Sequence, residues 1–483
     1  MLTRLSVQGF KSLLDVDVEL APLVVLMGPN AAGKSNLLEA LLLLSRLATE
    51  QTLRALPAFL EESRGSSLAC AEGLAGQAWS AVDVLDRVFC HNPQTKEVWA
   101  AARQQAAQLG LASASFLPGL SSKLTANRLS NENRFDTQKS AALTLSWLAF
   151  DFGARQAGLN SARQLLLAAI ANQEASTQSL FLTALQAYYN AQATRSAVSS
   201  TMLAEKSAET SLLAAETRYR VGTGTPAERL QAKTAYSQAQ LNRIKAEGEA
   251  KNALGVLANL MGLAPQTALM LLDTTQQIPD TQFVRDIEAM MQEAKLGRPD
   301  LKAAEAQLNA AMYSVDQARA QGRPTISISA GPAWQESAGI GMDSRNLALT
   351  VNVPIFAGFD THYRVRAAEA QLDQKTAQRD RLRQQVALDV WKAYQSLNTA
   401  TQSLQTAADL VSSAEQSERV ALGRYQAGVG NVLDVLTAQS ALASARLQRI
   451  QATLEWNYYR ASLAQAMGTL DYSLFSSDSG GKP

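Results

Sequence analysis

The sequence is short of the residues that build most catalytic and metal sites. It contains two cysteines and two histidines in 483 residues, and aromatic residues make up 6% of the chain. Cys70 and Cys90 are too few for a disulfide framework or a zinc-binding pattern. His91 and His362 have no catalytic partner near them in the sequence, which favours surface or packing roles. A formal net charge of +1 gives no basic footprint for nucleic acid. No run of 18 or more apolar residues occurs, so no transmembrane helix is expected.

What the chain does contain is an internal repeat. Landmark residues recur at a constant separation of 206 positions, as in 299 − 93 and 468 − 262. The matching landmarks are Pro93 and Pro299, Pro118 and Pro324, Phe150 and Phe356, Gly222 and Gly428, and Met261-Gly262 and Met467-Gly468. A constant separation indicates two copies of one structural unit with almost no net insertion. We assign the first copy to residues 76–290 and the second to 291–470, followed by a disordered tail at 471–483.

Each copy is expected to begin with a helix and continue with two strands. The helical stretches Pro93–Leu117 and Pro299–Arg323 are each followed by a proline, whose ring removes an N–H and clashes with the preceding turn. Residues of alternating polarity follow. The clearest apolar sets are Leu347, Leu349, Val351, Val353 and Ile355; Leu143, Leu145 and Trp147; and Ile326, Ile328 and Ala330. Period-two alternation predicts strands with one apolar face, and lengths near about ten residues suit tilted membrane strands.

Long helical hairpins are expected after the strands. Proline-free, Ala/Gln/Leu-rich patterns run from about residue 155 to 220 and from about 362 to 426. Such lengths are typical of coiled coils or extended helical assemblies, and each helix would reach about 100 Å. Each pattern ends at a Gly-x-Gly turn, where glycine permits a sharp reversal. A second long helix then returns to Met261 or Met467.

The strands make an oligomer necessary if they lie in lipid. Four strands per chain cannot close a barrel, and open sheet edges are not tolerated in a membrane. A trimer would supply twelve strands. The alternative from the residues alone is a soluble helical bundle with two small hairpins, which leaves the apolar strand faces without cover.

Residues from about Ser80 to Leu470 resemble the TolC-type outer-membrane efflux family. The motifs that carry the resemblance are Asn92-Pro93, Arg298-Pro299-Asp300, Val353-Pro354-Ile355-Phe356-Ala357-Gly358-Phe359, Arg424-Tyr425-Gln426-Ala427-Gly428-Val429-Gly430 and Val432-Leu433-Asp434-Val435-Leu436. The resemblance implies a mainly α fold with membrane β-strands: a homotrimeric twelve-stranded β-barrel in the outer membrane and a long α-barrel across the periplasm. It implies no catalytic site and no required cofactor. It also implies a passive conduit for efflux or type I secretion, joined through a periplasmic adaptor to an inner-membrane ABC or RND pump.

The resemblance assigns roles to the hairpin turns. It implies adaptor contact at the periplasmic tips, formed by Tyr219, Val221, Gly222, Thr223, Gly224, Tyr425, Ala427, Gly428, Val429 and Gly430. It implies an acidic constriction at Asp434, and the repeat places Glu228 at the equivalent position (434 − 228 = 206). Carboxylate rings favour cations. Thr437 stands where many members carry a second aspartate, which weakens the expected constriction. Without the resemblance, the residues alone favour a solvated helix face for both acids.

The first 65 residues are a separate segment. Gly28-Pro29-Asn30-Ala31-Ala32-Gly33-Lys34-Ser35 matches the Walker A pattern between an apolar run and a helical pattern. With Leu5–Leu13 it resembles the start of RecF/SMC-like AAA P-loop ATPases, which implies an α/β fragment. The resemblance implies ATP and Mg²⁺ bound by Gly28, Asn30, Gly33, Lys34 and Ser35.

The remaining parts of an ATPase are missing from the sequence. No glutamate follows Asp151 or Asp273, the two candidate Walker B aspartates, so ATP hydrolysis is not expected. The alternative function is nevertheless a P-loop ATPase of DNA repair or phage defence, with the long helices as a coiled-coil arm. The pairs of alternating strands argue against it.

Residues 66–75 form a junction between the two parts. Ala69-Cys70-Ala71 looks like a signal-peptidase site, although the residues before it are ATPase-like rather than basic and then apolar. We expect a fusion, natural, engineered or a gene-model error, that replaced the signal peptide of an exported channel.

Overall fold

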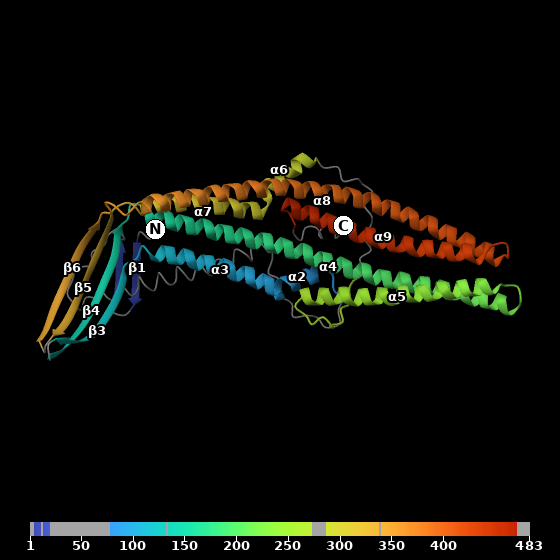
Figure 1. Cartoon of the computed structure of the whole chain (residues 1–483), viewed down its shortest axis with the longest axis horizontal. Helices are drawn as coiled ribbons and strands as arrows, with labels where there is room; N and C mark the ends of the chain where they lie inside the picture. The colour runs from blue at the N-terminus through green and yellow to red at the C-terminus, as the bar shows by residue number, and fades with distance from the viewer. Residues whose placement is uncertain are drawn as a thin grey trace.

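The chain is long and narrow, with its main sheet at one end and two helical turns at the other (Figure 1). The computed structural model describes residues 4–10, 13–19, 78–131, 134–272, 286–337 and 340–470. The Walker A residues 28–35, the junction at 66–75 and the tail at 471–483 therefore lie outside the described residues. No described helix is long and apolar enough to cross a membrane.

The order of elements confirms the two-copy fold. The first copy contains α2 (Ala81–His91), α3 (Pro93–Ala114), β3 (Gly119–Asn131), β4 (Arg134–Phe150), α4 (Ala154–Arg220) and α5 (Pro226–Leu260). The second contains α6 (Ile287–Gly297), α7 (Pro299–Ala320), β5 (Thr325–Ser337), β6 (Ile340–Asn352), α8 (Asp360–Gln426) and α9 (Val432–Met467). Each element begins 206 residues before its counterpart, as in 360 − 154 for α8 and α4. A separate hairpin, β1 (Arg4–Phe10) and β2 (Leu13–Glu19), precedes both copies.

Helix lengths follow the sequence closely, with small differences at the ends. Helices α4 and α8 each have 67 residues, which is about 100 Å of helix. Helices α3 and α7 end at Ala114 and Ala320, three residues before the predicted ends (117 − 114 and 323 − 320). Those residues form a turn instead, and Leu117 donates its N–H to the Ala114 carbonyl. The chain therefore leaves the helix before the proline.

The four strands of the main sheet are antiparallel in the order β3-β4-β5-β6. They have 13 to 17 residues, longer than expected. The two copies meet where β4 pairs with β5, with Leu145 opposite Ala330 and Trp147 opposite Ile328. Strands β3 and β6 each have one strand partner in the part of the chain that the structure describes, so each leaves one backbone edge unpaired.

The helices are joined end to end beside the two continuous ones. Helix α4 contacts α3, α5, α7 and α9, whereas α8 contacts α6, α7 and α9. The end of α9 meets the start of α7 at Gly468, where a Cβ would lie 3.0 Å from the Arg298 Cα. Gly262 makes the same approach to His91 in the first copy. Both glycines have a positive φ, at 70° and 77°. Close approach and a left-handed backbone together explain the repeated Met-Gly.

Two apolar clusters hold the short helices α2 and α6 against the long ones. Val84, Leu85 and Val88 of α2 pack against Tyr188 of α4. In the second copy, Met290 and Ala294 of α6 pack with Val386 and Val390 of α8. Much of the remaining core is alanine, which lets the helix backbones approach closely. Burial of these side chains supplies the main stabilisation at the middle of the molecule.

The joint between α9 and α7 contains a partly buried ion cluster. The Arg298 guanidinium lies 2.6 Å from Asp300 and 3.0 Å from Asp389, and its side chain is 15% exposed. Burial lowers the pKa of Arg298, but the hydrogen bonds to Asp300 and Asp389 outweigh it, and the pKa is raised above its ordinary value. The equivalent residue in the first copy is Asn92, whose side-chain amide donates to the Leu260 carbonyl. The two joints thus use different chemistry on the same backbone.

Arg298→Met tests this cluster. It leaves Asp300 and Asp389 without their cation, so we expect a loss of about 1–3 kcal/mol, less than for a fully buried pair because both acids contact water. The measurement is denaturant unfolding in detergent, followed by helical circular dichroism. Arg319→Met is the matched control, because its pair with Glu369 is exposed and is worth less than about 1 kcal/mol. Equal losses for both variants would contradict the assignment.

Candidate functional site

The two hairpin turns at the far end of the helices share one geometry. Gly222 and Gly428 have φ values of 80° and 78°. A Cβ on Gly224 would lie 3.0 Å from the backbone N of Tyr219, and one on Gly430 would lie 2.8 Å from that of Tyr425. The first glycine of each Gly-x-Gly therefore supplies a left-handed backbone, and the second supplies space. The sequence motif is explained by these two separate requirements.

The tyrosines before the turns are not equivalent. Tyr425 is 5% exposed and packs with Val432 and Val435, whereas Tyr219 is 39% exposed. The Arg218 guanidinium lies 4.5 Å from the centre of the Tyr425 ring, so it links the first hairpin to the second. Tyr219 is instead covered by Arg229 of its own hairpin, at 4.7 Å. Within the described residues, the buried Tyr425 hydroxyl has no hydrogen-bond partner.

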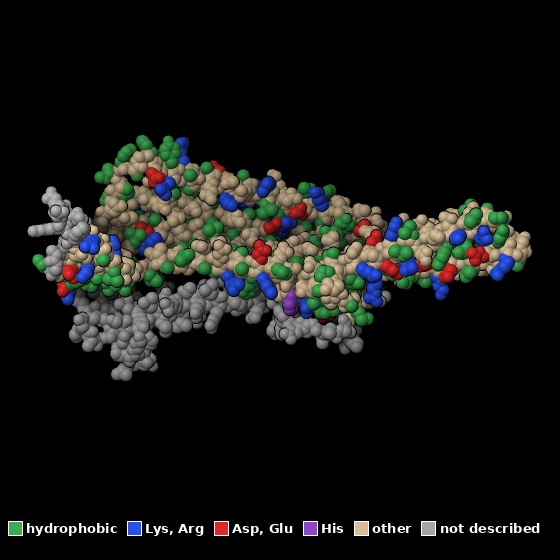
Figure 2. All heavy atoms as spheres, turned by 60° about the horizontal axis from the view of Figure 1, so that its bottom comes forward, with side chains coloured by type: hydrophobic (Ala, Val, Ile, Leu, Met, Phe, Trp, Pro, Cys, Tyr) green, Lys and Arg blue, Asp and Glu red, His purple; other side chains and the backbone are tan. Residues whose placement is uncertain are grey.

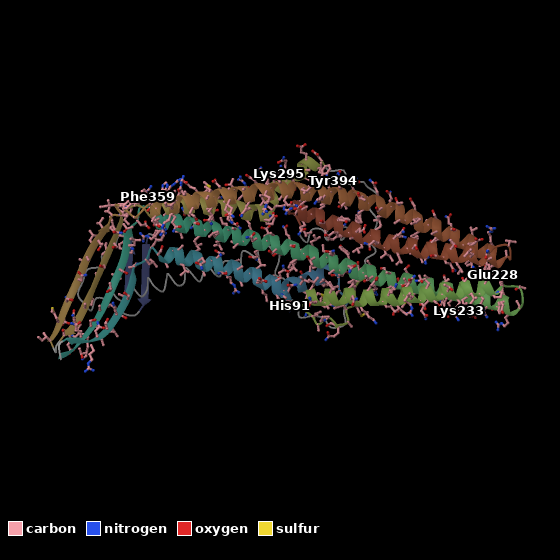
Figure 3. The ribbon with its side chains drawn as sticks, in the orientation of Figure 1. His91, Glu228, Lys233, Lys295, Phe359 and Tyr394 are labelled. Carbon is pink, nitrogen blue, oxygen red and sulfur yellow. The ribbon has the colours of Figure 1, made fainter. Side chains whose placement is uncertain are left out.

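The two candidate constriction acids also differ. Glu228 accepts a hydrogen bond from the Thr225 N–H while its own N–H donates to the Thr225 hydroxyl, which forms a capping box at the start of α5. Asp434 lies in the first turn of α9, where the cap is Asn431. It is exposed, and no hydrogen bond or ion pair holds its carboxylate among the described residues. Figure 3 shows Glu228 close to the hairpin turn. Glu228 has a clear role in the fold, whereas the carboxylate of Asp434 remains available.

The tips expose apolar as well as glycine surface. Val221 and Val429 are exposed at the turns, and Leu230 and Leu433 are exposed in the helical turns that follow. Thr223 donates its N–H to the Arg218 carbonyl, and Val429 donates to the Arg424 carbonyl, so both turns are held by backbone bonds. The remaining predicted tip residues, Gly222, Thr223, Ala427 and Gly428, are exposed as well. Such a surface is suited to contact with another protein.

The opposite end of the molecule presents an apolar wall. The strand register places one set of side chains on a single face: Leu120, Leu124, Ala141, Leu143, Leu145, Trp147, Ile326, Ile328, Ala330, Trp334, Leu347, Leu349 and Val351. The opposite face carries small and polar residues, including Ser146, Ser329 and Thr350. Figure 2 shows hydrophobic side chains gathered at this end, while charged side chains are scattered along the helices. The alternation predicted for the strands is confirmed by the register.

Other candidate sites carry less. No group of three or more metal-binding side chains lies close together in the described ranges. Asp151 accepts hydrogen bonds from the Arg155 backbone and guanidinium at the start of α4, which is a capping role. Cys90 is disulfide-bonded, a bond that the cysteine count did not predict, and Cys70, the other cysteine, lies outside the described residues.

Known families match both parts of the chain. The model of the outer membrane efflux protein family matches residues 84–263 and 290–469. The chain belongs to the outer membrane efflux protein family. It is an outer-membrane efflux channel of the TolC type, in a family of non-enzymatic channels that need no cofactor. A model of an AAA domain, described as a putative AbiEii toxin of a type IV toxin–antitoxin system, matches residues 23–69.

Individual relatives agree with the family. Protein CyaE of Bordetella pertussis is 31% identical over 82% of this chain and 85% of its own length. The pyoverdine export outer membrane protein OpmQ of Pseudomonas aeruginosa is 26% identical over 77% of this chain and 82% of its own. The open-state MtrE outer membrane channel of Neisseria gonorrhoeae superposes with a TM-score of 0.71 at 20% identity, covering 81% of this chain and 89% of that one. The last comparison shows that the channel shares its fold.

Sequence reasoning missed several contacts at the two ends of the channel. The stacking of Arg218 on Tyr425 joins residues 207 positions apart (425 − 218), and no local pattern announces it. The capping role of Glu228 could have been found, because Thr225-x-x-Glu228 is a capping-box pattern.

Gly224→Ala tests why the second glycine of the tip is needed. The added Cβ meets the backbone at Arg218 and Tyr219, so we expect the turn to open and its amides to exchange faster, by about tenfold for a local cost near 1.4 kcal/mol. The measurement is hydrogen–deuterium exchange of peptides covering residues 218–229. Gly248→Ala is the control, because a Cβ there meets nothing within 4 Å and alanine favours the interior of α5. Faster exchange at the tip in the control variant, or none in Gly224→Ala, would count against this explanation.

Proposed function

We propose that three copies of this chain form one channel-tunnel, a passive conduit that takes cargo from an inner-membrane pump through a periplasmic adaptor. Residues 76–290 and 291–470 act as its two repeats. The conduit carries no catalytic machinery, so the energy for transport comes from the pump. The hairpin tips, from Tyr219 to Gly224 and from Tyr425 to Gly430, are the surface that the adaptor contacts. The observation that carries the proposal is the pair of unpaired sheet edges, which the repeat relates to each other.

The repeat supplies the geometry of the contact between subunits. Within one chain, β4 of the first copy pairs with β5 of the second. Moving each strand to its counterpart, by +206 and −206, turns this contact into β6 of one chain against β3 of the next. Since Leu145 lies opposite Ala330, Val351 lies opposite Leu124 of the neighbouring chain. The same step, repeated around the ring, satisfies every backbone edge and leaves no open strand in lipid.

The helices support the same arrangement. Within the chain, Ser211 of α4 hydrogen-bonds to Gln439 of α9 at 3.3 Å. The counterparts of these residues are Ser417 on α8 and Lys233 on α5, which places Ser417 against Lys233 of the next chain. Leu436 and Leu447 line a cavity of about 150 Å³ between α4, α5 and α9. Their counterparts, Leu230 and Leu241, are exposed in the single chain, as residues at a subunit interface would be.

The number of subunits follows from the family. Three chains of four strands give twelve, and channels of the TolC type are trimers. The type I secretion and efflux roles share this architecture, and the pump and the cargo decide between them.

A second activity is favoured by one observation, the match of residues 23–69 to an AAA domain. Lys34 and Ser35 would hold ATP phosphates and Mg²⁺, with Gly28, Asn30 and Gly33 shaping the loop. Without a Walker B acid the segment would bind nucleotide and not hydrolyse it. Equilibrium binding of ATP to the purified chain decides this point.

The strand register between chains is tested with paired cysteines. We expect Leu124→Cys with Val351→Cys to form disulfide-linked trimers, visible as a ladder on a non-reducing gel, because the two positions lie directly opposite each other. The control pair is Leu124→Cys with Leu347→Cys, which lies four residues along β6, about 13 Å away, and should not link. Links in the control pair, or only monomers for the first pair, would refute the proposed seam.

Asp434→Asn tests the acidic ring. Because three copies of this exposed carboxylate would surround the conduit, we expect the variant to lose preference for cations over anions. The measurement is the reversal potential of single channels in a planar bilayer under a salt gradient. Glu228→Gln is the matched control, since glutamine preserves the capping box and that carboxylate is already engaged. A shift of the reversal potential in the control alone would reverse the assignment of the two acids.

A further inference from the structure

The two turns that join the sheet to the long helices have an unusual backbone. The turn from β4 to α4 is closed by a bond from the Ala154 N–H to the Asp151 carbonyl, and the turn from β6 to α8 by one from Asp360 to Ala357. Both central residues of each turn have a positive φ: Phe152 (50°) and Gly153 (96°), and Gly358 (59°) and Phe359 (65°). These are the dihedral signs of a mirror-image turn, whose central positions are usually glycine, asparagine or aspartate.

A phenylalanine occupies one central position in each turn. In the described part of the chain, Phe152 and Phe359 are the only residues other than glycine with a positive φ. The left-handed backbone is unfavourable for a side chain with a Cβ. The order of the two residues is reversed between the copies, Phe-Gly in one and Gly-Phe in the other. A ring is therefore retained at both turns, although not at equivalent positions, and a strained residue that is retained points to a function for its side chain.

The two rings belong to exposed aromatic pairs. Phe152 packs edge-on against Phe150, with ring centres 4.7 Å apart, and Phe359 packs edge-on against Phe356 at 5.6 Å. All four rings are exposed in the single chain, Phe356 by 76%. Phe150 is opposite Ile326 in the strand register, so its pair borders the helical end of the apolar wall. Figure 3 shows Phe359 at the junction of the sheet and the helices.

We propose that Phe150, Phe152, Phe356 and Phe359 form a collar that sits at the headgroup–acyl boundary of the membrane leaflet nearer the helices. The strained backbone at Phe152 and Phe359 is kept because it holds these two rings at that depth. The phospholipid boundary is the occupant that fits, since the collar continues the apolar wall of an outer-membrane protein. Aromatic residues prefer this boundary, where an apolar ring meets the polar headgroups.

The residues next to the collar fit a phospholipid surface. In the first turns of α8, Tyr363, Arg364 and Arg366 are exposed. In the first copy, Arg155 stacks on the Phe116 ring at 4.8 Å and is paired with Asp151. An exposed guanidinium just beyond an aromatic ring is placed to meet phosphate groups while the ring meets the acyl chains. The charges along the collar therefore change from none to basic in the direction that the headgroups require.

The test measures depth in the membrane directly. Phe359→Trp keeps an aromatic ring and adds fluorescence to that of the native tryptophans, which is subtracted using the unchanged protein. The protein is inserted into phosphatidylethanolamine–phosphatidylglycerol vesicles whose acyl chains carry bromine either near the headgroup or near the methyl end. We expect the added fluorescence to be quenched most by bromine near the headgroup. Val420→Trp, on an exposed site of α8 toward the tips, is the matched control and should be quenched by neither lipid.

A second variant separates anchoring from folding. Phe359→Gly removes the ring and also removes the strain, so a purely structural role predicts insertion equal to or better than that of the unchanged protein. An anchoring role predicts that the equilibrium for insertion into vesicles falls by on the order of tenfold. Added fluorescence from Phe359→Trp that only aqueous iodide quenches, or undiminished insertion of Phe359→Gly, would overturn the proposal. The inference rests on the outer-membrane location, and failure of the collar would leave the cysteine links of the proposed trimer intact.

Discussion

The unpaired edges of β3 and β6 are the constraint on which the rest of the molecule depends. A strand edge carries a row of N–H and C=O groups that need partners, and in lipid no water supplies them. Within the chain this need is met once, where β4 pairs with β5. The constant 206-residue spacing keeps every element of one copy in register with the other, so that a contact made inside the chain can be repeated between chains.

The two copies share a backbone but not their polar contacts. The end-to-end helix joint uses the amide of Asn92 in one copy and the ion cluster of Arg298 in the other. Arg243 of α5 bonds to Glu205 of α4, whereas the counterpart of Glu205 is Val411, which lies in an apolar cluster with Leu442. Because these differences preserve helix length and spacing, the backbone symmetry survives them. The side chains are free to differ wherever the two copies meet different neighbours.

Local chemistry was legible in the sequence wherever one residue type decides the backbone. The prolines marked the starts of α3 and α7, the Gly-x-Gly motifs marked the hairpin turns, and period-two alternation marked the wall of Leu347, Leu349 and Val351. The candidate tip residues were placed correctly at the end of the helices. The difference between Glu228 and Asp434 was not predicted, because it depends on which side chain reaches back to the helix cap.

The sequence by itself determined the repeat, the lengths of the long helices and the apolar face of the strands, because each depends on residue identity and spacing along the chain. Only the tertiary structure decided that Arg218 covers Tyr425, that Arg298 reaches Asp389, and that Phe152 and Phe359 occupy left-handed turns. These features depend on where distant segments meet and on the angle at which a strand enters a helix. Neither quantity is encoded in a local pattern of residues.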